Sequence, residues 1–134
     1  MFIHPRLWID VFDEAVAELE VPPADRIRVG SKAVCEAIDS DPIPVRRAMQ
    51  VALDIPQLMR GYAAVSQMWI DRLAVEVLDD PSDSDRVFRS RVVGAAIMGV
   101  IDASLNQWMA ADPRFATLEP LLMAGLDYIE PILH

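Results

Sequence analysis

The stretch RSRVVGAAIMGVIDASLNQWMAADP, residues 89–113, decides how this chain folds. An ordinary surface helix carries one apolar stripe along the side that faces the core. Here apolar side chains point in nearly every direction, and Gly94, Ala95, Gly99 and Ala103 are small enough for another helix to approach closely. We therefore expect a helix that is covered on two sides. Because periodicity does not say which chain supplies the cover, a central helix in a monomer and a two-fold contact between two copies both remain open.

The rest of the chain shows helical spacing of apolar residues, interrupted by prolines, and no sustained strand alternation. Prolines in first turns mark several helix starts, since a first-turn residue needs no intrahelical N–H bond. The spacing predicts six helices, at residues 6–20, 23–38, 44–53, 56–77, 83–111 and 118–129. The fold class is therefore all-α, a six-helix bundle, and the length fits one domain over residues 1–134.

Charge and cysteine content exclude several classes of protein. The 21 acidic residues outnumber the 12 basic ones, and Lys32 is the single lysine, which argues against nucleic-acid binding by this chain. The lone Cys35 cannot form an intramolecular disulfide and fits a reducing compartment, so we expect a cytoplasmic protein. No signal-peptide pattern is visible, and Asp102 and Gln107 interrupt the most apolar stretch, so no membrane contact is expected.

The sequence offers a binding pocket rather than a catalytic site. No set of residues has the spacing of a nucleophilic triad, a metal site or a phosphate loop, so we expect no enzyme, metal or cofactor. Aromatic and flexible sulfur side chains, in contrast, suit an adaptable apolar pocket. The candidate ligand-binding residues are Trp8, Phe12, Met49, Met59, Tyr62, Met68 and Trp69. For each residue taken alone, ordinary core packing is the competing interpretation.

Three segments carry a resemblance to a known family. FRSRVVGAAIMGVIDASLNQWMAADP and LEPLLMAGLDYI resemble the penultimate and last helices of TetR-family transcriptional regulators, and PVRRAMQVALDIPQLMRGYAAVSQMWIDRLAVEV is similar to that family's middle region. The resemblance covers essentially the whole chain through loose patterns. It implies a ligand-binding and dimerisation domain in which the last two helices form a four-helix dimer interface. The interface residues expected on this basis are Val93, Ala96, Ile97, Val100, Leu121 and Gly125.

The resemblance also implies a regulatory domain that lacks a DNA-binding domain, because the family's N-terminal helix-turn-helix domain is not present in this chain. The leading hypothesis is a homodimer that binds a small, largely apolar effector and thereby changes the spacing of attached DNA-binding domains. The alternative is a stand-alone helical module whose apolar surface docks on a different protein. An enzyme is the weakest of the three hypotheses, since no convergent set of titratable groups is visible.

Overall fold

The computed structural model describes residues 5–114 and 116–134, and within that part of the chain it is mostly helical and contains no strand. The helices are α1 (Pro5–Val16), α2 (Pro23–Ser40), α3 (Pro42–Asp54), α4 (Pro56–Val77), α5 (Ser84–Ala110) and α6 (Glu119–Tyr128), followed by the short 3-10 helix η1 (Glu130–Ile132). The predictions of an all-α fold and of six helices are confirmed. Their boundaries agree closely for α4 and α5 and differ at the end of α1 and the start of α3.

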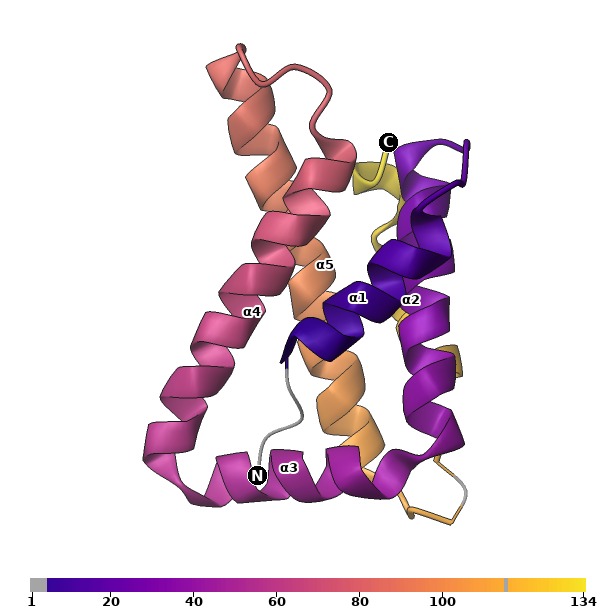
Figure 1. The fold of residues 1–134 in the computed structure, drawn as a ribbon, viewed down its shortest axis with the longest axis vertical. Helices are drawn as coiled ribbons and strands as arrows, with labels where there is room; N and C mark the ends of the chain where they lie inside the picture. The colour runs from indigo at the N-terminus through magenta and orange to yellow at the C-terminus, as the bar shows by residue number, and fades with distance from the viewer. Residues whose placement is uncertain (1–4, 115) are drawn as a thin grey trace.

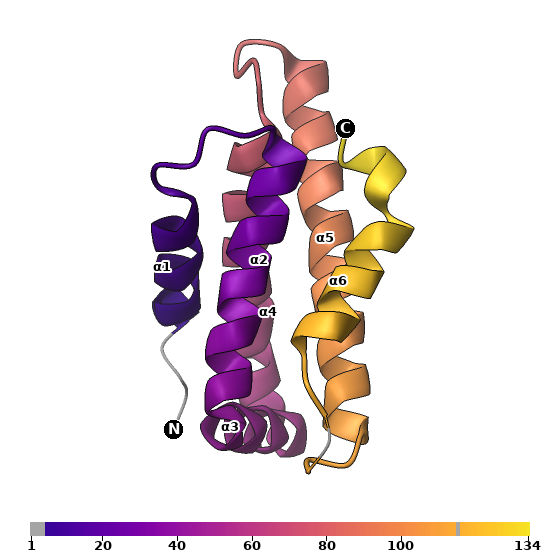
Figure 2. The same cartoon turned by 90° about the vertical axis from the view of Figure 1, so that its right-hand side faces the viewer.

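The helices form a bundle in which α5 packs against α4 and α6. In Figure 1, α4 and α5 run side by side and α3 crosses the base between the lower ends of α2 and α4. In Figure 2, α1 lies on one side of the bundle and α6 packs along α5 on the opposite side. The long helix α5 is thus covered by α4 and α6 of its own chain.

Glycines set three of the helix contacts. A Cβ atom on Gly94 would lie 2.7 Å from the Ile70 carbonyl oxygen, so α5 approaches the backbone of α4 as only glycine allows. Gly30 on α2 likewise leaves room for the ring of Phe12, and Gly125 on α6 leaves room for Val100 of α5. These contacts bring neighbouring helix axes together and fix which face of each helix points inward.

Two apolar clusters form the core, and α5 contributes to both. The first includes Phe12 of α1 and the fully buried Leu73, Ile97 and Leu126. The second surrounds the fully buried Trp108. The Arg46 guanidinium lies 4.3 Å from the centroid of the Trp108 ring, and its Nη2 donates to the Trp108 carbonyl oxygen over 2.9 Å. A basic residue of α3 therefore covers the indole of α5 and holds the end of that helix.

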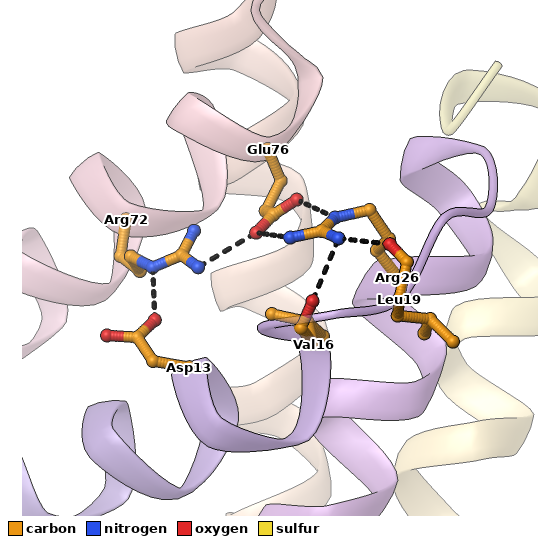
Figure 3. A network of polar contacts seen from close by, with 6 residues as sticks. All are labelled: Asp13, Val16, Leu19, Arg26, Arg72 and Glu76. Atoms are coloured by element: carbon orange, nitrogen blue, oxygen red, sulfur yellow. Dashed lines mark hydrogen bonds and ion pairs between the residues drawn. The ribbon is translucent and has the colours of Figure 1, made fainter.

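A polar network joins α1, α2 and α4 (Figure 3). Arg26 Nε donates to Glu76 over 2.7 Å, and Arg72 Nη2 donates to the same carboxylate over 2.8 Å. Arg72 Nε also donates to Asp13 on α1 over 2.6 Å. The Glu76 side chain is only 6% exposed, so its charge is compensated by two guanidinium groups rather than by water.

The same network explains why α1 ends at Val16 rather than at residue 20 as predicted. Arg26 Nη1 donates to the carbonyl oxygens of Val16 and Leu19, over 2.9 and 2.6 Å. These carbonyls follow the last full turn, where helical partners run out. A side chain from α2 thus replaces further helical bonding, and the chain turns toward Pro23.

A carboxylate from α2 performs the corresponding role at the start of α6. The preceding residue, Leu118, makes no side-chain cap. Instead Asp39 Oδ1 accepts from the Leu118 N–H over 2.8 Å, and Asp39 Oδ2 accepts from the Glu119 N–H over 3.1 Å. Since the first N–H groups of a helix lack intrahelical partners, Asp39 supplies both the acceptors and a favourable charge.

By length and composition alone, α5 would be long and apolar enough to cross a membrane. One helix of this kind is weak evidence for a membrane span, and 33% of its most apolar window is buried inside the bundle. The helix also carries Asp102, which accepts a hydrogen bond from Tyr62 on α4.

Candidate functional site

A cavity of about 390 Å³ lies between α2, α3, α4 and α5, with Trp8 of α1 and the start of α6 completing its wall. Its size falls within the range of small-molecule sites. The wall is almost entirely apolar. It is formed by Trp8, Ser31, Val34, Cys35, Ile38, Val45, Ala48, Met49, Ala52, Gly61, Tyr62, Val65, Trp69, Met98, Ile101, Ser104, Leu105, Leu118 and Leu122.

The structure places four of the seven candidate ligand-binding residues in this wall: Trp8, Met49, Tyr62 and Trp69. Phe12 lies outside it and is fully buried, because its ring fills the space over Gly30 and meets the Trp69 ring edge to face, with centroids 5.9 Å apart. Met68 is half-buried and also lies outside the wall. The side chain of Met59 lies outside the described part of the structure.

Sequence reasoning missed the small residues that make the cavity. Ser31, Ala48, Ala52 and Gly61 come from three helices and leave space between the larger side chains. Small residues are common on any packed helix, so their pattern in the sequence carries no signal for a cavity. The contribution of α5, through Met98, Ile101, Ser104 and Leu105, was also missed, because that helix was assigned to the dimer interface.

Two hydroxyls in the wall, those of Tyr62 and Ser104, already donate to protein acceptors. Tyr62 Oη donates to Asp102 Oδ1 over 2.6 Å, and Ser104 Oγ donates to the Val100 carbonyl oxygen over 2.7 Å. Burial and then the hydrogen bond to Asp102 raise the pKa of Tyr62 well above its ordinary value, so the phenol stays protonated. A ligand would therefore meet neutral groups at this end of the cavity.

Cys35 lies in the wall with its side chain buried. Burial, reinforced by the charges of Asp39, Glu119 and Glu36, raises the pKa of its thiol to about 12. Because the thiolate is the nucleophilic form, Cys35 is unreactive at neutral pH, and a ligand in this cavity would be held without a covalent bond. Within the described residues, no three His, Cys, Asp or Glu side chains are grouped as a metal site would require.

The six residues predicted for the dimer interface differ in their burial within the single chain. Val93 and Ile97 are 3% and 0% exposed in the chain's own core, and Gly125 faces Val100 of α5. Ala96, Val100 and Leu121 are half-buried. We define the exposed stripe as the exposed apolar and small residues of α5, about one residue further round that helix, together with those of α6 and η1. It consists of Phe88, Val92, Ala95, Gly99, Ala103, Ala124, Tyr128 and Ile132.

Comparison with known proteins adds one finding. Neither the curated proteins nor the solved structures gave a match to this chain. A family model described as the MftR C-terminal domain, one of the TetR C-terminal domain models, matches residues 21–134. The match includes α2 to α6, hence most of the cavity wall and the whole exposed stripe, whereas α1 precedes it. The chain belongs to the family of TetR-type C-terminal regulatory domains.

Proposed function

We propose that residues 1–134 form one effector-binding and dimerisation domain of a TetR-like regulator, which acts in the cytoplasm and has no enzymatic activity. The DNA-binding domain that it controls would lie outside this chain, as the acidic composition of the chain also favours. The apolar cavity of about 390 Å³ carries this proposal, since it can hold a small, largely apolar effector.

The cavity also offers a route from effector to output. Trp8 projects from α1 into the cavity wall, and Asp13 of the same helix pairs with Arg72 of α4. An effector that contacts Trp8 would favour one position of α1 relative to α4. A ligand shifts such an equilibrium only as far as its affinities for the two arrangements differ. The output is therefore a population shift in α1.

Binding to the cavity can be tested with a neutral apolar fluorophore, N-phenylnaphthylamine. Gly61 lies in the wall, and a Cβ atom there would meet nothing within 4 Å, so Gly61→Phe adds a ring without a clash at its base. We expect this variant to lose probe binding while it keeps its thermal stability. Val75→Phe, at a 65% exposed position of α4, is the matched control. Equal probe binding by both variants would contradict the proposal.

The exposed stripe supports dimerisation. Phe88, Val92 and Tyr128 are 69%, 48% and 89% exposed, an unusual concentration of apolar and aromatic surface for a monomer. Two copies related by a two-fold axis would cover it with α5 and α6 of each chain, which gives the four-helix interface expected for the family. Gly99 sits within the stripe, with nothing within 4 Å of a Cβ atom there.

Light scattering tests this interface. We expect a dimer for the wild type, a folded monomer for Gly99→Arg and a dimer for Val75→Arg, whose site lies on α4 outside the stripe. A wild-type monomer at micromolar concentration would overturn the dimer. It would favour instead a stand-alone module whose apolar stripe docks on another protein.

A further inference from the structure

The chemistry of the cavity wall indicates which effectors it accepts. No Arg, Lys or His is among the described residues that line the cavity, although the chain carries 12 basic residues. An anion placed there would lose its hydration without gaining a counter-charge, which is strongly unfavourable in an apolar site. Carboxylates act on two wall residues: Asp102 accepts a hydrogen bond from Tyr62, and the charges of Asp39, Glu119 and Glu36 act on Cys35.

Two hydroxyls in the wall favour one direction of hydrogen bonding. Tyr62 and Ser104 both use their protons on protein acceptors, at 2.6 and 2.7 Å, so each offers a ligand only lone pairs.

We infer that the cavity selects an uncharged effector whose apolar body carries a hydrogen-bond donor, a hydroxyl or an N–H, which bonds to the Tyr62 oxygen, and that it rejects carboxylates and phosphates. The inference rests on the proposed effector-binding function and specifies its ligand class. It depends on the pairing of Tyr62 with Asp102, because a phenol without that acceptor would be free to donate to an anion.

Competition with N-phenylnaphthylamine tests this selection using four molecules of similar length: decanol, methyl decyl ether, decanoate and decylammonium. The ether keeps the oxygen of the alcohol but not its proton. We expect decanol to displace the probe with an affinity about fivefold higher than that of the ether, as one net hydrogen bond gives. We expect decanoate to bind at least about tenfold more weakly than decanol, because its charge is buried unpaired.

Two variants test whether Tyr62 is the residue that gives decanol its higher affinity. Tyr62→Phe removes the acceptor, so decanol should lose its advantage over the ether, whereas binding of the ether should change little. Tyr128→Phe removes a hydroxyl that is 89% exposed on the outer stripe and should leave all affinities as in the wild type. Thermal unfolding of both variants shows whether the fold is retained. A Tyr62→Phe protein that still prefers decanol over the ether would overturn the role of this residue.

The outcomes separate the two proposals. Decanoate or decylammonium binding as tightly as decanol, or an ether equal to decanol in the wild type, would overturn the ligand class and leave effector binding intact. If neither the probe nor any of the four molecules is bound, or if Gly61→Phe binds them all as the wild type does, the cavity is not the effector site and the proposed function fails with the inference.

Discussion

Replacing Glu76 by Gln tests whether the polar network of Figure 3 holds the bundle together. The carboxylate is 6% exposed and accepts three hydrogen bonds, at 2.7, 2.8 and 3.3 Å, from Arg26 and Arg72. Removing one partner of a fully buried ion pair costs about 3–5 kcal/mol. The two arginine side chains, however, are 25% and 21% exposed and retain some hydration. Since a glutamine oxygen can still accept one bond, we expect a loss of about 2–3 kcal/mol.

The measurement is the free energy of unfolding from urea titrations followed by circular dichroism. For a domain of this size, the loss corresponds to a fall in Tm of roughly 6–12 °C. Glu36→Gln is the matched control, because Glu36 is 62% exposed and its nitrogen–oxygen distance to Lys32 is 3.9 Å. A pair of that kind contributes at most about 0.5 kcal/mol. If the two variants unfold at the same urea concentration, Glu76 does not hold α1, α2 and α4 together.

Acid should remove the same stabilisation. Burial alone would raise the pKa of Glu76, but the hydrogen bonds from Arg26 and Arg72 outweigh it, so the pKa in the folded protein lies below its ordinary value. The contribution is therefore fully present above the unfolded pKa of about 4.3 and is lost as the pH falls through the lower folded value. The stability difference between wild type and Glu76→Gln should shrink over this range. A difference that stays constant down to about pH 2, well below the ordinary carboxyl range, would contradict the assignment.

Three other predictions concern the contacts that position the cavity. Asp39→Asn keeps one acceptor for the start of α6 but loses the charge, so urea titration should show a loss of about 1–2 kcal/mol, and a loss near zero would refute the capping role. Gly94→Ala should lower the free energy of unfolding by about 1–3 kcal/mol, because the new methyl group meets the Ile70 carbonyl. Gly61→Ala should raise it by about 0.5–1 kcal/mol, because a Cβ atom there meets nothing within 4 Å. A higher Tm for Gly94→Ala than for Gly61→Ala would show that the close approach of α4 and α5 is misassigned. Cys35 should react with a maleimide only after urea unfolds the protein, and rapid labelling of the native state would contradict its burial.

The helices could be predicted from the sequence because proline positions and apolar spacing are local signals, and each helix obeys them within a few residues. The end of α1 could not, because it depends on Arg26, a residue of the next helix, reaching back to the carbonyls of Val16 and Leu19. The start of α6 depends in the same way on Asp39. Such caps join residues far apart in the chain, and no local pattern reveals them.

The inward face of α5 was equally hidden, although the apolar character of that helix was plain. When apolar residues surround a helix, a rotation by one residue exchanges Val92 for Val93 without changing the pattern. The rotation is set by Gly94, whose missing side chain lets the Ile70 carbonyl of α4 come close. A glycine in a helix indicates that another segment packs closely there, but only the structure of that segment shows which face of the helix it contacts. The family resemblance predicts that α5 and α6 form the dimer surface, and which of their residues do so stays a prediction.

Which residues line the cavity also depends on the neighbouring helices, as two aromatic residues of α1 show. Trp8 and Phe12 lie one turn apart on the same face, so the sequence cannot distinguish their roles. Opposite Phe12, α2 carries Gly30, and the ring sinks into that gap and becomes core. Trp8 finds no such gap and stays in the cavity wall beside Val34. Filling the gap opposite Phe12, as Gly30→Ala would, should therefore displace α1 and change the cavity without altering any residue of its wall.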